Sequence, residues 1–118
     1  MMKRKIYNEM LLWKQNAQGK SALMIDGARR IGKSYIVEEF AKNEYKSYIL
    51  VDFNNADDNL IEIFDKYLRN LDVFFSYLAL YYNVTLYPRD TVIVFDEVQL
   101  YPKARAAIKY LVKDGRYD

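Results

Sequence analysis

The chain has 118 residues, enough for one domain with a hydrophobic core, and 52% of them are hydrophobic, which excludes general disorder. Its 18 basic and 16 acidic residues leave a net charge of +2, so charge gives no general argument for a nucleic-acid or anionic membrane partner. The sequence contains no cysteine and no histidine, which excludes disulfides, thiolate metal sites and histidine bases.

The amino-terminal third predicts a helix, a strand and a second helix. Residues 5–15 carry apolar side chains at helical spacing and end in a polar turn. Residues 21–25 are short and apolar, which predicts a buried strand, and residues 35–42 predict the helix that follows it. The basic residues at the start precede no stretch typical of a signal peptide, and no window reaches a membrane-spanning length. We therefore expect a cytoplasmic protein with no membrane partner.

The middle of the chain predicts another strand and two helices. Residues 48–53 form an apolar run closed by two asparagines, which favours a buried strand followed by a turn. Residues 58–82 have a helical pattern with a break near position 71, where Asn70 or Asp72 is suited to cap the second helix.

The last third completes an alternating pattern. Residues 91–95 predict a third buried strand, and Pro102 opens a last helix that ends near Gly115. Strands that alternate with helices imply a parallel sheet with right-handed crossovers and helices on both faces. The predicted fold is therefore an α/β, three-layer sandwich of the P-loop NTPase type, represented by its three amino-terminal strands.

A phosphate-binding motif lies between the first predicted strand and its helix. Residues 27–34 match the pattern G-x-x-x-x-G-K-S, and such a turn aims backbone N–H groups and the positive end of the helix dipole at one phosphate. Lys33 is expected to reach the β- and γ-phosphates, and the Ser34 hydroxyl to bind Mg²⁺. The residues predicted to bind the nucleotide are Gly27, Ala28, Arg29, Arg30, Ile31, Gly32, Lys33, Ser34 and Tyr35.

Three of these residues have a second interpretation. Arg29 and Arg30 contact phosphate or a neighbouring subunit, or they are solvated side chains on an exposed turn. Tyr35 touches the nucleotide or packs against the core. The motif alone leaves these alternatives open.

A pair of carboxylates follows the third predicted strand. Asp96 and Glu97 would emerge at the carboxyl edge of a parallel sheet, where such sheets bind ligands, and the phosphate loop emerges at the same edge. Asp96 is expected to hold Mg²⁺ and Glu97 to polarise a water molecule for in-line attack on the γ-phosphate. The predicted catalytic residues are therefore Lys33 and Glu97, and the predicted metal ligands are Ser34 and Asp96.

The motifs leave several functions open. The leading hypothesis is the binding of Mg-ATP with hydrolysis, and the alternatives are a nucleotide-binding or oligomerisation module without catalysis and a P-loop kinase. Glu97 argues against a kinase, which needs no water-activating glutamate at this position. Gln99 senses the γ-phosphate or is a polar residue that begins a loop, and Asp52 is a ligand-edge acid or an ordinary solvated strand end.

With both motifs, the sequence resembles the AAA-type P-loop ATPases of bacteria and archaea. More narrowly, it resembles the prokaryotic ATPases that join an AAA-type core to a helical region and a nuclease-like carboxyl-terminal domain. The matching stretches are residues 4–13, 27–34, 96–99 and 105–114. The resemblance implies adenine as the base of the nucleotide.

The resemblance also implies parts that these 118 residues do not contain. In AAA-type sheets a further strand inserts between the phosphate-loop strand and the strand that ends in the acidic pair, here residues 91–95. Residues 1–118 would therefore correspond to the amino-terminal portion of the ATPase domain. We expect hydrolysis in the full-length protein and weak or no activity in this portion. Because buried unpaired backbone groups are costly, we also expect either direct pairing of the first and third strands or self-association, through strand completion or as an AAA-type oligomer. A nucleic-acid partner is expected only through absent domains.

Overall fold

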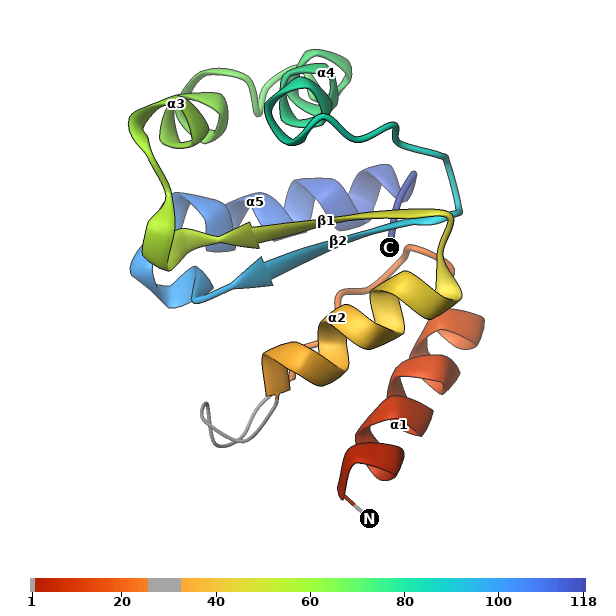
Figure 1. Ribbon diagram of the computed structural model, residues 1–118. Coiled ribbons are helices and arrows are strands. Elements are labelled where there is room, and N and C mark those ends of the chain that lie inside the picture. The colour runs from red at the N-terminus through yellow and green to blue at the C-terminus, as the bar shows by residue number, and fades with distance from the viewer. Residues whose placement is uncertain (1, 26–32) are drawn as a thin grey trace.

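The computed structural model describes residues 2–25 and 33–118 and places a parallel two-stranded sheet between helices (Figure 1). The elements in chain order are α1 (Met2–Ala17), α2 (Lys33–Glu44), β1 (Ser47–Asp52), η1 (Phe53–Asn55), α3 (Asp58–Lys66), α4 (Leu71–Tyr82), β2 (Thr91–Asp96), η2 (Val98–Leu100) and α5 (Pro102–Asp114). Figure 1 shows α1 and α2 on one side of the sheet and α3 and α4 on the other. The predicted α/β class with helices on both faces is confirmed for this part of the chain.

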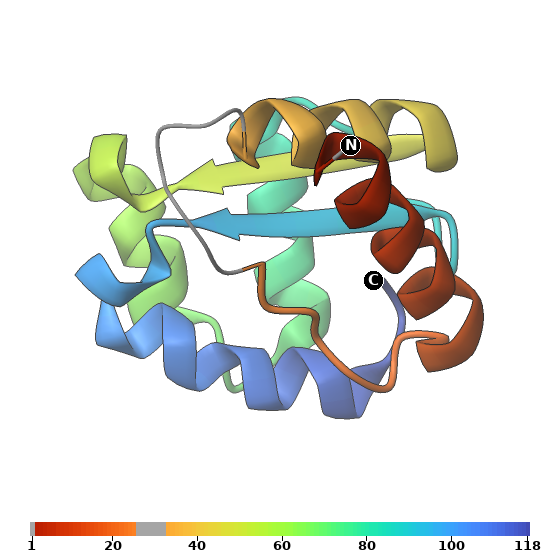
Figure 2. The same cartoon turned by 90° about the horizontal axis from the view of Figure 1, so that it is seen from below.

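The sheet pairs the second and third predicted strands. β1 and β2 run parallel, in a register that extends from Ser47 opposite Thr91 to Asp52 opposite Asp96. The predicted strand over residues 48–53 ends one residue early, because the Asp52 side chain accepts a hydrogen bond from the backbone N–H of Asn54 and starts the η1 turn. Both strands finish at the same end of the molecule (Figure 2).

The prediction of a buried strand over residues 21–25 is wrong. These residues belong to no strand and have no partner in the described sheet, and Leu23 and Met24 are 38% and 74% exposed. An apolar run becomes a strand only when a neighbouring backbone pairs with it, and β2 does not pair with this segment. The expected direct pairing of the first and third strands is therefore also wrong, and the described sheet has two strands.

Two hydrophobic clusters cover the two faces of the sheet. Alternate residues of β2 point to opposite faces, so Val92 and Val94 pack with α1 and α2, while Ile93 and Phe95 pack with α3, α4 and α5. Phe64 of α3 is 1% exposed at the centre of the second of these clusters. The alternation of residues along β2 thus decides which helices pack on each face of the sheet.

Local chemistry accounts for the helix ends. The Asp57 and Asn70 side chains accept hydrogen bonds from the N–H groups of Leu60 (2.9 Å) and Val73 (3.4 Å) and cap α3 and α4. Of the two residues predicted to cap the second helix, Asn70 is therefore the one that does so. Gly115 ends α5 with a positive φ of 72°, a conformation that glycine adopts without strain, as predicted.

Candidate nucleotide-binding site

The start of α2 and the ends of both strands lie at one end of the molecule. α2 begins at Lys33, and Figures 1 and 2 show its first turn on the side to which both strands point. The predicted loop residues Gly27, Ala28, Arg29, Arg30, Ile31 and Gly32 lie outside the described residues. Their predicted role, and that of the Lys33 and Ser34 side chains, stays a prediction.

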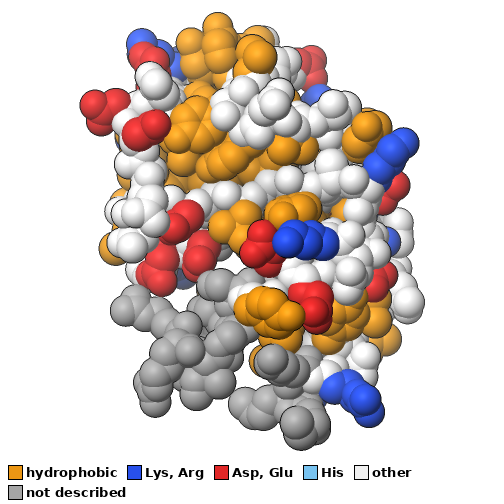
Figure 3. Space-filling model, in the orientation of Figure 1, with side chains coloured by type: hydrophobic (Ala, Val, Ile, Leu, Met, Phe, Trp, Pro, Cys, Tyr) orange, Lys and Arg blue, Asp and Glu red, His pale blue; other side chains and the backbone are white. Residues whose placement is uncertain are grey.

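Acidic residues end the two strands side by side. Asp52 and Asp96 are register partners, and Figure 3 shows acidic side chains gathered at this end of the molecule. The Asp52 carboxylate accepts hydrogen bonds from the Asn54 N–H (2.9 Å) and the Asn55 side-chain amide (2.8 Å). Asp52 therefore forms part of a turn. Its interpretation as an ordinary strand end is better supported than its interpretation as an acid that binds ligand.

Glu97 has an unusual backbone conformation. Its φ and ψ are 58° and 39°, in the left-handed region that non-glycine residues adopt at a cost. The N–H of Leu100 donates to the Glu97 carbonyl (3.0 Å), which closes the η2 turn, and the Gln99 amide donates to the Glu97 carboxylate (2.5 Å). The turn and the amide together orient the carboxylate that sequence analysis predicted to be catalytic.

The segment after Glu97 is attached to α3. Tyr101 stacks on Phe53 with ring centroids 6.0 Å apart, and its hydroxyl donates to the Asp65 carboxylate, which also accepts from Lys103 (2.8 Å). Burial, together with the hydrogen bond to Asp65, raises the pKa of Tyr101 to about 12. The hydrogen bond from Lys103, with a smaller contribution from Tyr101, lowers the pKa of Asp65 below its usual value. Sequence analysis missed this anchor, because no local pattern connects residue 65 with residue 101.

Tyr35 lies on the first turn of α2 and is 58% exposed. Its hydroxyl donates to the Glu39 carboxylate one turn later (3.3 Å). Tyr35 therefore does not pack into the core, and contact with a nucleotide is the open alternative.

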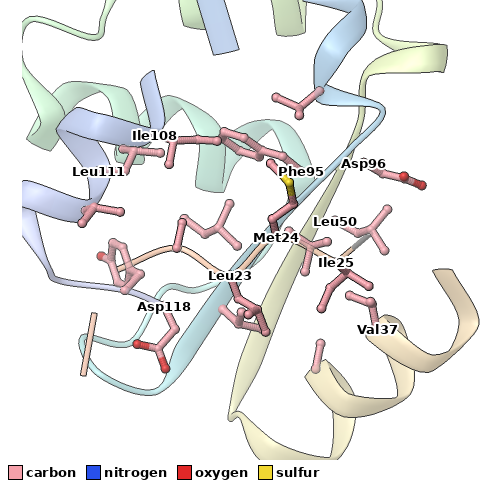
Figure 4. Close-up of a pocket in the computed structure, with 18 of the residues that line it drawn as sticks. Leu23, Met24, Ile25, Val37, Leu50, Phe95, Asp96, Ile108, Leu111 and Asp118 are labelled. Carbon is pink, nitrogen blue, oxygen red and sulfur yellow. The ribbon is translucent and has the colours of Figure 1, made fainter. Parts of the chain in front are cut away.

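A cleft of about 700 Å³ opens beside the carboxylates. Asp96, Glu97 and Gln99 are among the residues that line it, and its walls are formed mainly by apolar residues of β2, α5 and residues 21–25 (Figure 4). Within the described ranges no group of three or more acidic, histidine or cysteine side chains is placed to hold a metal ion. A magnesium ion bound at Asp96 would therefore need further ligands from the nucleotide or from the phosphate-loop motif.

A sheet of parallel strands with helices on both faces is the architecture of an α/β domain, and its two strands end in carboxylates at the edge where such sheets commonly bind ligands. Residues 19–118 match the family model described as AAA domain, and the chain belongs to that family. Neither a curated protein nor a solved structure matches the chain. In the described part of the chain, no helix has both the length and the apolar character needed to cross a membrane.

Proposed function

We propose that this chain binds Mg-ATP between the start of α2 and the end of β2, and that the full-length protein hydrolyses it. The observation that carries the proposal is the position of the start of α2 relative to the end of β2. The helix that begins at Lys33 and the strand that ends at Asp96 converge on one end of a domain of the AAA family. Membership of that family supports ATP as the nucleotide.

Each residue has a distinct role in this proposal. Lys33 neutralises the β- and γ-phosphates, while the Ser34 hydroxyl and the Asp96 carboxylate offer the hard oxygen ligands that Mg²⁺ prefers. Glu97 orients and polarises the attacking water, and the magnesium ion, when bound, neutralises charge on the phosphates. The hydrogen bond from Gln99 supports this role, because a positioned carboxylate loses less freedom when it engages a water molecule.

The proposal extends to the protein as a whole. We place it with the cytoplasmic prokaryotic ATPases that carry a nuclease-like carboxyl-terminal domain, on the sequence resemblance alone. Residues 1–118 are then the amino-terminal portion of the ATPase domain, and hydrolysis by this portion is weak or absent.

Two measurements separate binding from hydrolysis. Fluorescent mant-ATP should bind wild type in the presence of Mg²⁺, and Lys33→Ala should weaken that binding strongly because the phosphate charge loses its partner. Glu97→Gln should retain binding and lose any phosphate release that wild type shows. Glu9→Gln, which changes an exposed carboxylate of α1, is the matched control.

The results distinguish the three functions. Equal phosphate release by wild type and Glu97→Gln contradicts hydrolysis by this chain, and Mg-ATP binding without release supports the binding-module alternative. Equal mant-ATP affinity for wild type and Lys33→Ala contradicts the nucleotide site itself. The kinase alternative has lost its expected support, because β2 pairs with β1 and not with residues 21–25.

A further inference from the structure

The outer face of α5 carries a row of cations. Arg105, Lys109 and Lys113 are exposed and follow one another at intervals of four residues, so they lie along one side of the helix with a rise of about 6 Å between neighbours. We call these three residues the basic row. Residues 102–113 contain no acidic residue. Figure 2 shows α5 at the margin of the molecule, on the side of β2 away from β1, and the exposure of the basic row means that no described segment covers it.

The carboxylates at the two ends of α5 do not neutralise the basic row. Asp65 of α3 accepts a hydrogen bond from Lys103 (2.8 Å) at the start of the helix, and Asp114 pairs with Arg116 (3.0 Å) at its end. Within the described residues, no ion pair joins the basic row to a carboxylate. Like charges one helical turn apart repel each other, so the row destabilises the helix that carries it, and a bound anion would relieve that repulsion.

An exposed aromatic ring lies beside the basic row. Tyr110 is 54% exposed, lies one turn before Lys113, and makes no ring contact or hydrogen bond with any described residue. Ala106, one turn before Tyr110, is also exposed and carries only a methyl group, so it leaves space beside the ring. Cations next to an exposed ring are the combination that binds single-stranded nucleic acids, because the cations hold the phosphates while a base stacks on the ring.

We propose that the outer face of α5 binds single-stranded nucleic acid, with the basic row on its phosphates and Tyr110 stacked on a base. An evenly spaced row of cations suits a polymer whose negative charge repeats evenly, and the ring favours a nucleic acid over an acidic peptide, whose carboxylates offer no flat face for stacking. The net charge of +2 does not reveal this surface, because acidic residues elsewhere cancel the charge of α5. The proposal does not depend on ATP binding at the start of α2.

The salt dependence of binding tests the charge contacts. Fluorescence anisotropy of labelled oligo-dT and oligo-rU should show binding whose log K falls with log salt at a slope of about −2, as expected for three phosphate contacts on a single strand. Whichever oligomer binds more tightly identifies DNA or RNA as the preferred strand. Arg105 also lines the cleft beside β2, so the variants change the other two cations. Lys109→Glu combined with Lys113→Glu should weaken binding about tenfold or more at low salt.

The matched control is Lys5→Glu combined with Lys20→Glu, which makes the same change in net charge at exposed positions outside α5 and should leave the affinity near that of wild type. Circular dichroism establishes that every variant is folded. Absence of oligomer binding at low salt overturns the proposal, as does an equal loss of affinity in the two double variants.

Substitution of Tyr110 separates a nucleic acid from an acidic protein as the partner. Tyr110→Ala should weaken oligomer binding about fivefold or more, because the stacked base loses its ring, whereas Tyr110→Phe keeps the ring and should bind as wild type does. Poly-glutamate should compete poorly with either oligomer. If poly-glutamate competes equally and Tyr110→Ala leaves the affinity unchanged, the surface recognises negative charge alone, and the proposal of a nucleic-acid site is wrong.

Discussion

At the scale of a single residue, Glu97 combines a strained backbone with a predicted catalytic role. A left-handed conformation costs a residue with a Cβ about 1–2 kcal/mol, and glycine avoids this cost. Glu97 has a φ of 58° where β2 turns into η2. The proposed role in water activation explains why a carboxylate lies where glycine would be more stable.

Replacing Glu97 tests this balance of stability and function. Glu97→Gly should raise the free energy of unfolding by about 0.5–1 kcal/mol, because relief of the strain exceeds the added entropy of the unfolded chain. Glu97→Gln keeps the strain and should leave stability nearly unchanged. Urea unfolding of both variants is the measurement, and a Gly variant less stable than the Gln variant would show that the side chain itself stabilises the turn.

At the scale of the elements, Tyr101 joins the start of α5 to α3. Its pKa is raised to about 12 in the folded chain, against about 10 when unfolded. The folded state therefore keeps its proton between these two values while the unfolded state ionises, so stability is fully present below about pH 10 and falls as pH rises toward the folded pKa. Tyr101→Phe should remove the part of the stability loss at alkaline pH that comes from ionisation of Tyr101. It should also lower stability at neutral pH, because the hydrogen bond to Asp65 is absent.

The measurement is the urea midpoint from neutral pH to about pH 11. Tyr110→Phe is the control, because Tyr110 lies on α5, the helix that Tyr101 precedes, and is 54% exposed. If the Tyr101 and Tyr110 variants lose stability with the same alkaline slope, Tyr101 does not titrate as the structure indicates.

At the scale of the whole molecule, Phe64 connects the second hydrophobic cluster. It is 1% exposed, and its ring lies 5.2–5.6 Å from the rings of Phe53, Phe74 and Phe95. These neighbours come from η1, α4 and β2, so one side chain holds three elements against α3.

Phe64→Ala should lower the free energy of unfolding by about 3–5 kcal/mol, a large part of the stability of a small domain. Leu80→Ala, at a side chain 75% exposed, should change it by less than about 0.5 kcal/mol. Guanidinium unfolding with a common m-value measures both, and similar losses for the two variants would contradict the position of the core.

Local sequence signals predicted most of the helices and strands. The exception was a strand whose formation depends on pairing with a distant segment. The cap at Asn70, the proline that opens α5 and the glycine that ends it act within one helical turn, so the sequence reveals them. A strand depends on a partner that is distant in sequence, so the apolar residues 21–25 were predicted to pair and do not.

For the candidate site, too, local features were predicted from the sequence and long-range contacts were not. The sequence by itself determined the two motifs and the family, because both are defined by residue type and spacing within a few positions. Only the tertiary structure decided that Tyr101 and Asp65 fasten the loop after Glu97 and that an apolar cleft lies beside β2. The physical reason is that motifs arise from neighbouring residues, whereas anchors and clefts arise from contacts between segments that only folding brings together.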